Sequence, residues 1–206
     1  MFRGRCRHLL IGASLGIAAL PAFASLACAQ PAPGPLAQGR QALTVHGERY
    51  GTLADDHPLT LKVRGIFEKT VRAAGRRPGV ALEVHVLDTP RVIAQALPGG
   101  LVVVSRGLTD LARSDENALA FILGHEVAHL LRDHHGLLGS LGVLGAGSTT
   151  GRVPASAEQA RAYQAMELEA DRLGVLFSAL AGYQASAAIP VLLTLTARTG
   201  PDLFHP

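Results

Sequence analysis

The chain has 206 residues, and its 19 basic and 16 acidic side chains give a formal net charge of +3. Three of the basic residues, Arg3, Arg5 and Arg7, lie at the N-terminus, and the remaining 16 basic residues balance the 16 acidic ones. No basic stripe with interleaved aromatic residues is left, so the composition argues against a nucleic-acid-binding protein. The chain is long enough for one hydrophobic core and too short for two large ones.

The N-terminal segment predicts a cleavable signal peptide over residues 1–29. Its arginines precede an apolar run from Leu9 to Ala24, and Ala27-Cys28-Ala29 fits the small-residue pattern of a cleavage site. The run is too short and too interrupted for a membrane anchor, which needs about 20 apolar residues. We therefore expect export to the periplasm or cell envelope, with lipid attachment at Cys28 as the less favoured alternative. The mature chain then has no transmembrane helix, although membrane association stays open.

Both cysteines, Cys6 and Cys28, lie in this leader, so the mature chain offers neither a disulfide nor a thiolate ligand. Residues 30–41 are rich in Pro, Gly and Ala without periodicity, which predicts a flexible linker. The folded domain is expected to occupy residues 42–206. Any metal ion in it must be held by His, Asp or Glu.

Apolar spacing predicts the first elements of this domain. Residues 59–74 repeat apolar side chains at helical intervals, and Gly75 ends the pattern. Residues 80–87 alternate in the manner of a half-buried strand. A turn at Pro98-Gly99-Gly100 leads into a second strand over residues 101–104.

Helices are expected to fill the rest of the domain. Ser114 N-caps a long helix that runs to about His135. Repeated glycines over residues 136–151 predict a mobile loop. Two further helices are expected over residues 155–180 and 185–197.

The long helix carries the motif His125-Glu126-Val127-Ala128-His129. Residues four apart on a helix share a face and lie about 6 Å apart, so the two imidazoles can hold one zinc ion. Glu126 is rotated by about 100° from His125, which lets it activate a water molecule as general base. The motif predicts His125 and His129 as metal ligands and Glu126 as the catalytic residue. The alternative is an ordinary amphipathic helix, but two buried histidines on it would need partners.

His135 is the nearest candidate for a third ligand, as in the pattern H-E-x-x-H-x-x-G-x-x-H. That pattern needs a glycine to turn the chain, and this sequence has Arg132 at that position. We therefore expect His134 and His135 to be exposed residues at the end of the helix, where the helix dipole favours them.

The segment from Met166 to Gly174 offers a better third ligand. Glu167 and Asp171 share one face of the expected helix, whereas Glu169 points elsewhere. We predict Glu167 as the third metal ligand and Asp171 as the hydrogen-bond partner of a ligand histidine. For this segment alone, a helix with solvated charges is the alternative.

These motifs resemble a known family, the HtpX, BepA and CAAX-prenyl-protease type of zinc metallopeptidases (metallopeptidase family forty-eight). The similarity runs from about Leu97 to Gly182 in four ordered blocks: Leu97-Pro98-Gly99-Gly100 before Leu101-Val102-Val103-Val104, Asp115-Glu116 through His129, Glu167 through Gly174, and Ala181-Gly182-Tyr183. The resemblance implies an α+β fold, a mostly helical minimal zincin-like domain with a small β-sheet and an active-site helix. It also implies one Zn²⁺ per chain and cleavage of polypeptides at internal bonds.

The resemblance adds two expectations about the surroundings of the metal. In such enzymes an edge strand near the metal pairs with the substrate backbone and aligns it. The resemblance assigns this role to Gly100, Leu101, Val102 and Val103. His205-Pro206 resembles a His-Pro pair that can approach and regulate the metal, so His205 is a candidate regulatory ligand.

The expected function is therefore a zinc-dependent endopeptidase that acts on misfolded or envelope proteins in protein quality control. The alternative is a chaperone-like binding module whose zinc is structural or latched by His205. A zinc hydrolase of non-peptide substrates also stays open. A structural zinc normally has four protein ligands, so three ligands beside Glu126 favour catalysis.

Overall fold

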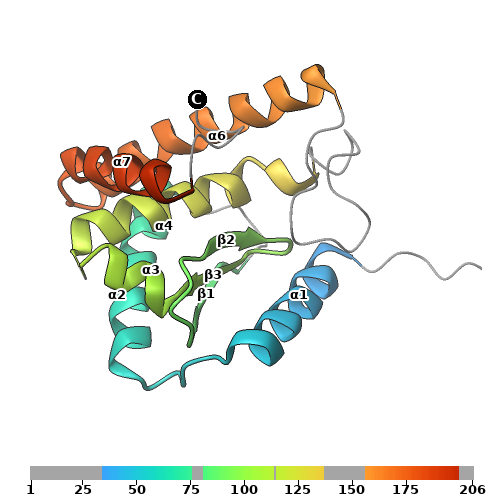
Figure 1. Ribbon diagram of the computed structural model, residues 1–206, viewed down its shortest axis with the longest axis vertical. Coiled ribbons are helices and arrows are strands. Elements are labelled where there is room, and N and C mark those ends of the chain that lie inside the picture. Colours follow the sequence, from blue (N-terminus) through green and yellow to red (C-terminus); the bar gives the residue numbers. More distant parts are fainter. Residues whose placement is uncertain (1–33, 76–80, 114, 137–155, 200–206) are drawn as a thin grey trace, which may run out of the picture. The chain divides into compact units, whose positions relative to one another are not determined.

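The computed structural model describes residues 34–75, 81–113, 115–136 and 156–199 (Figure 1). The chain divides into two units, Met1–Ala32 and Pro33–Pro206, and everything that follows concerns the second. Three expectations lie outside the described residues: the signal peptide over residues 1–29, the mobile loop beyond Gly136 and the regulatory role of His205.

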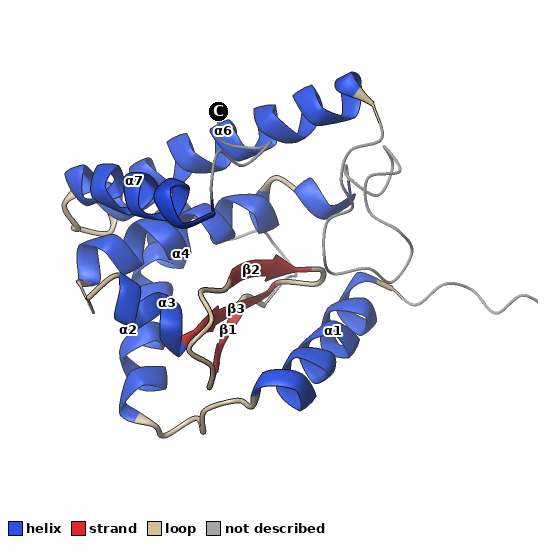
Figure 2. Ribbon diagram, in the orientation of Figure 1, coloured by secondary structure: helices blue, strands red, loops and turns tan. Residues whose placement is uncertain are grey.

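Helices surround one three-stranded sheet in the described part of the chain (Figure 2), which confirms the predicted mostly helical α+β fold. None of these helices is both long and apolar enough to cross a membrane. In chain order the elements are α1 (Pro35–Tyr50), α2 (Pro58–Ala74), β1 (Glu83–Leu87), β2 (Ala94–Leu97), β3 (Leu101–Ser105), α3 (Arg106–Leu111), α4 (Glu116–Leu131), α6 (Ala157–Leu180), the 3-10 helix η1 (Ala185–Ala187) and α7 (Ala188–Thr199).

The sheet has the order β1-β3-β2, with β1 parallel and β2 antiparallel to the central strand. Val102 of β3 pairs with Val84 on one side and with Ala96 on the other. Both edges of β3 are therefore hydrogen-bonded, and it cannot take up a further strand. The predicted substrate strand over residues 100–103 is wrong for this reason, and β2 is the edge strand that lies against α4.

All five residues of β3 are buried because helices cover both faces of the sheet. Leu101 and Val103 belong to a small core cluster with Ala42 of α1. Val102 and Val104 point to the opposite face and join the main cluster with α2, α4 and α6. Figure 1 shows α1 in blue on one side of the sheet and α4 and α6 on the other.

Helices α4 and α6 pack at very short range. A Cβ atom added at Gly124 would lie 2.9 Å from the carbonyl oxygen of Gly174, and one added at Gly174 would lie 2.9 Å from the backbone nitrogen of His125. Contacts of this kind leave no room for a side chain on either glycine. The glycine pair therefore brings the two helices together beside the histidine motif.

Helix α1 replaces much of the predicted linker over residues 30–41. Pro35 takes the first helical turn, where its missing N–H costs nothing. A Cβ on Gly39 would collide with the carbonyl group of Pro98, so only glycine allows α1 to approach this turn. The small residues of this segment thus form a packing surface, and the linker prediction fails from Pro35 onwards.

Helix α4 differs from its predicted form at both ends. Its N-cap is Asp115, whose carboxylate accepts a hydrogen bond from the amide of Asn117 at 2.9 Å. The helix ends at Leu131 and does not continue to His135, because Asp133 adopts a left-handed conformation with φ of 55°. Aspartate tolerates this conformation better than most residues. The turn sends His134 back toward the protein interior.

Candidate metal centre

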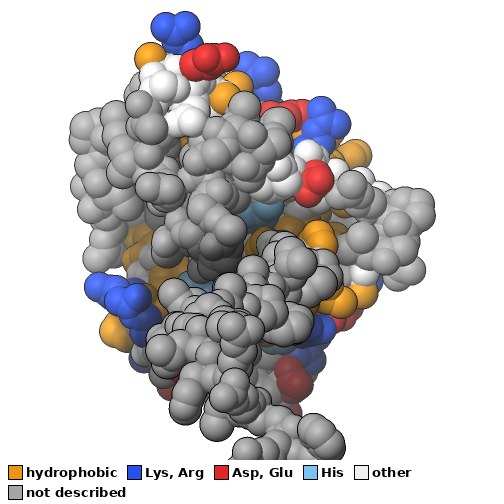
Figure 3. Space-filling model, turned by 90° about the vertical axis from the view of Figure 1, so that its right-hand side faces the viewer, with side chains coloured by type: hydrophobic (Ala, Val, Ile, Leu, Met, Phe, Trp, Pro, Cys, Tyr) orange, Lys and Arg blue, Asp and Glu red, His pale blue; other side chains and the backbone are white. Residues whose placement is uncertain are grey.

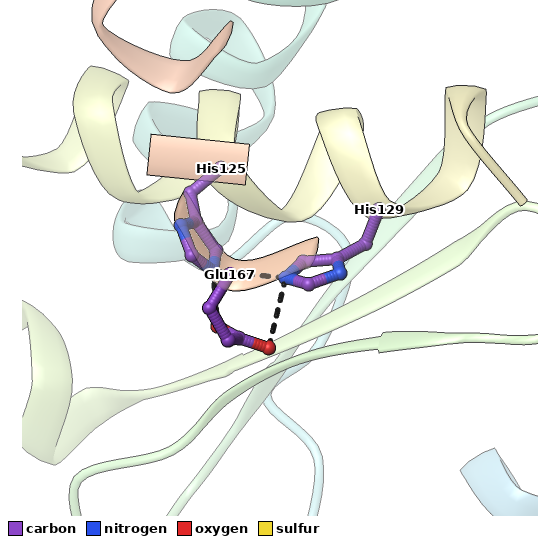
Figure 4. A group of neighbouring side chains, drawn as sticks. All are labelled: His125, His129 and Glu167. Atoms are coloured by element: carbon purple, nitrogen blue, oxygen red, sulfur yellow. Dashed lines mark hydrogen bonds and ion pairs between the residues drawn. The ribbon is translucent and has the colours of Figure 1, made fainter. Parts of the chain in front are cut away.

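Three predicted ligands meet between α4 and α6 (Figure 4). The Nε2 atoms of His125 and His129 are 2.9 Å apart. The carboxylate of Glu167 approaches both imidazoles, with 3.3 Å to Nε2 of His125 and 3.6 Å to Nε2 of His129. One potential ligand atom from each residue lies within 4.8 Å of the others.

The arrangement of these atoms fits a zinc ion. Ligand atoms about 2.0–2.2 Å from a tetrahedral zinc ion lie roughly 3.3 Å from one another. The two Nε2 atoms are 2.9 Å apart, and the Glu167 oxygens Oε2 and Oε1 lie 3.3 Å and 3.6 Å from Nε2 of His125 and His129, values around that separation. Imidazole nitrogen and carboxylate oxygen are also ligand types that zinc accepts. The residues present therefore fit a zinc ion held by two imidazoles and one carboxylate.

The charges of the site match this interpretation. Burial opposes protonation of His125, but its hydrogen bonds to Asp171 and Glu167 prevail and raise its pKa to about 10. Burial acts to raise the pKa of Glu167, but hydrogen bonds from His125 and His129 hold that pKa well below its usual range. The pocket thus stabilises positive charge beside the carboxylate, and a divalent cation can supply that charge in place of the proton.

Asp171 and Glu126 make different contacts beside the histidine pair. The Oδ1 atom of Asp171 is 2.9 Å from Nδ1 of His125, the nitrogen that faces away from Glu167. Glu126 is buried, and its side chain reaches β2, where its Oε2 atom accepts a hydrogen bond of 2.6 Å from the amide of Ala96. Glu126 is not a member of the ligand group.

His134 is the residue that the sequence interpretation placed wrongly. Its side chain is 3% exposed, and its Nδ1 atom is 2.9 Å from Nδ1 of His129. Its Nε2 atom is 3.3 Å from Oε2 of Glu169, whose other oxygen binds Arg132. Burial and the neighbouring His129 lower the pKa of His134, which favours its neutral form.

His135 is likewise partly buried, so the predicted exposure of both histidines is wrong. Both errors follow from the expectation that α4 continues past Leu131. The spacing of five residues between His129 and His134 has no meaning on a continuous helix, where residues three and four apart are neighbours.

A separate cavity of about 730 Å³ lies toward the N-terminus of α4. Its lining includes Val92, Leu111, Ile122 and Val191, and none of the three metal-binding candidates. On the face that Figure 3 draws, histidine side chains in pale blue lie near hydrophobic side chains. The cavity and the metal centre are thus distinct features.

Comparison with known proteins identifies relatives of this chain. Residues 59–162 match the family described as Peptidase family M48. The mitochondrial metalloendopeptidase OMA1 of Saccharomyces cerevisiae is 31% identical over 168 residues, which cover 68% of this chain and 46% of the yeast protein. The enzyme of the same name from Arabidopsis thaliana is 31% identical over 159 residues, covering 68% of this chain and 31% of the plant protein. The chain thus spans less than half the length of these relatives.

The predicted location in the periplasm or cell envelope is wrong, because these relatives are mitochondrial enzymes by name. The same holds for the relative from Schizosaccharomyces pombe, which is 32% identical over 95 residues, covering 46% of this chain and 27% of that protein. The signal peptide over residues 1–29 stays a prediction, since that segment lies outside the described part of the chain.

The family match begins in α2 and ends early in α6, so it contains the histidine motif but not Glu167. Members of this family are metallopeptidases that use zinc, which confirms the predicted type of enzyme and the predicted cofactor. Glu167 lies beyond the matched segment, and its position in the structure supplies a third residue suited to zinc. Because the match covers half of the chain, this protein belongs to peptidase family M48.

Proposed function

We propose that this protein is a zinc-dependent endopeptidase that cleaves extended segments of misfolded polypeptides. In this proposal His125, His129 and Glu167 bind the zinc ion, and Glu126 is the general base. The observation that carries the proposal is the meeting of these ligand atoms within 4.8 Å, with Glu126 nearby but outside the group. Three protein ligands leave one coordination position for water or substrate, as in catalytic zinc sites.

Glu126 moves the proton in the proposed reaction. When bound, the zinc ion polarises the peptide carbonyl and lowers the pKa of the attacking water. Glu126 accepts the proton of that water on its carboxylate and then donates it to the departing amine. Its hydrogen bond with the amide of Ala96 fixes the orientation of the carboxylate before substrate arrives.

The outer edge of β2 is the proposed binding site for the substrate backbone. The amide of Ser105 donates to the carbonyl of Ile93, so Ile93 and Gln95 direct their backbone groups toward β3. Ala94 and Ala96 alternate with them and direct theirs outward, and no strand pairs with this edge among the described residues. The amide of Ala96 already donates to Glu126, so an extended peptide would add beside β2 through the outward groups of Ala94, next to Glu126.

This mode of binding selects unfolded substrates. Strand addition needs a segment whose own backbone groups are free, and a folded domain offers few of them. Misfolded polypeptides meet this condition, which connects the geometry with a role in protein quality control.

The proposal is tested by zinc content and cleavage of casein, an unstructured protein, for the parent chain and its Glu126→Gln variant. Glutamine has the shape of glutamate and can still accept the Ala96 amide, so the variant should fold and bind zinc. We expect equal zinc in both proteins and cleavage by the parent alone, with a stable folded protein left intact. A parent chain that binds no zinc would overturn the proposal, and equal zinc with no cleavage by either protein would favour the binding module.

A further inference from the structure

The two ligand histidines need support at the nitrogen that does not face the metal. An imidazole that binds zinc through Nε2 carries its proton on Nδ1, and that buried N–H requires an acceptor. For His125 the acceptor is the carboxylate of Asp171, at 2.9 Å from Nδ1. The side chain of His129 is 11% exposed, and its Nδ1 atom faces His134 at 2.9 Å. Among the described residues no carboxylate takes this position for His129.

The directions of the hydrogen bonds around His134 follow from this requirement. If Nδ1 of His129 donates, Nδ1 of His134 must accept, and the proton of His134 then lies on Nε2. That nitrogen is 3.3 Å from Oε2 of Glu169, which can accept it. Arg132 binds the other oxygen of Glu169 and holds the carboxylate in place. Every donor in this chain of contacts has an acceptor, with both imidazoles neutral.

We infer that His134 and Glu169 are positioning residues for the zinc ligand His129, equivalent in role to Asp171 for His125. The inference rests on the proposed zinc site. Its geometrical basis is the left-handed turn at Asp133, which places His134 against the ligand that lies five residues earlier. The carboxylate of Glu169 fixes the tautomer of His134, and His134 in turn fixes the tautomer and the ring orientation of His129.

The two supports differ in their exposure. Side-chain exposure is 16% for Asp171 and 38% for Glu169, whereas His134 is buried. The relay thus connects His129 to a carboxylate near the surface, across the interface of α4 and α6. A variant of Glu169 can therefore test the relay with less risk to folding than a variant of His134, because its side chain is partly exposed to solvent.

The experiment compares zinc affinity, by chelator competition, for the parent chain, three variants of the relay and one control variant. His134→Leu keeps the bulk but removes the acceptor for His129, whereas His134→Asn places an amide oxygen near the position of the lost Nδ1. We expect His134→Leu to lower the zinc affinity by about 10- to 100-fold. His134→Asn should retain most of the zinc affinity of the parent chain. Glu169→Ala should weaken binding severalfold, and Glu158→Ala, an exposed glutamate of the same helix, should leave it unchanged.

A second readout separates positioning from a general loss of stability. In zinc-loaded protein labelled with nitrogen-15 histidine, NMR should show a ring N–H of His129 at Nδ1 that is protected from exchange with water. This signal should persist in His134→Asn and disappear in His134→Leu. Equal zinc affinity in all variants, or a His129 proton unaffected by His134→Leu, would overturn the inference while the proposed zinc site stands. Absence of zinc from the parent chain would overturn both.

Discussion

Substitution of Gly174 by alanine tests whether the metal centre depends on the close approach of α4 and α6. The added Cβ would lie 2.9 Å from the backbone nitrogen of His125, 3.1 Å from its Cα and 3.1 Å from the carbonyl oxygen of Phe121. All three atoms belong to the backbone of α4, so no side chain can rotate away. Helix α6 must therefore shift by a few tenths of an ångström.

The free energy of this change has two opposing parts. Alanine favours a helix over glycine by about 0.8–1 kcal/mol, whereas an overpacked core costs about 1–3 kcal/mol. The net result is a loss of about 0–2 kcal/mol of stability. Gly65→Ala is the matched control, because Gly65 lies on the exposed face of α2 and a Cβ atom added there meets nothing within 4 Å. This control should gain stability, with a rise in Tm of about 2–4 °C per kcal/mol.

Zinc affinity gives the more specific measurement. Ligand distances in zinc sites are held within about 0.2 Å, and the required shift of α6 moves Glu167 relative to His125 by a similar amount. We expect Gly174→Ala to weaken zinc binding at least about tenfold, the effect of losing a ligand's support. Calorimetry measures the Tm of each variant, and chelator competition measures its zinc affinity. The reasoning is refuted if Gly174→Ala and Gly65→Ala behave alike in both assays.

Three further predictions concern other parts of the structure. Asp171→Ala should weaken zinc binding by about 10- to 100-fold, because it removes the acceptor for Nδ1–H of His125, and Asp171→Asn should weaken it less. Equal zinc affinity in the parent chain and both variants would contradict this prediction. Removal of zinc by a chelator should lower Tm, since a ligand present at 100 times its Kd adds about 2.7 kcal/mol to the folded state; a Tm unaffected by the chelator would exclude a zinc bridge between α4 and α6. Burial of His46, with a smaller effect of Arg49, lowers the pKa of this imidazole despite its hydrogen bond with Gln95. The unfolded chain then binds a proton more readily than the folded one, so the folded state should lose stability as the pH falls below about 6.5. The urea midpoint of unfolding of His46→Phe should depend less on pH in that range than the midpoint of the parent chain.

The parts that the sequence predicted well carry strong local periodicity. Helix α2 repeats its apolar residues at helical spacing, and β3 is a continuous apolar run after a glycine turn. The pairs His125 with His129 and Glu167 with Asp171 each lie four residues apart, so a helix alone places each pair on one face. The spacing within each helix therefore predicts each pair without any knowledge of the contact between α4 and α6.

Other elements depend on contacts that no local pattern reveals. Residues 94–97, Ala-Gln-Ala-Leu, contain no β-branched or aromatic side chain, and β2 forms because it pairs with β3 and lies against α4. In α1 the residue Gly39 suggests a flexible linker in the sequence, but it is buried, and the neighbouring Ala42 packs against the sheet. The error over the substrate strand has the same origin, since edge and centre are decided by pairing partners.

The ends of α4 show how much a single backbone angle can change the interpretation of a site. With a continuous helix to His135, the two last histidines point into solvent and have no function. The left-handed residue Asp133 instead buries His134 against His129, and His134 there meets Glu169 of α6. The signal available in the sequence was indirect: a histidine five residues after a ligand, and a carboxylate two residues from each of Glu167 and Asp171. Such residues gain meaning only when α4 and α6 are in contact, and the glycine pair that permits this contact lies directly beside His125. The chemistry of the site therefore depends on the packing of these two helices as much as on the motif itself.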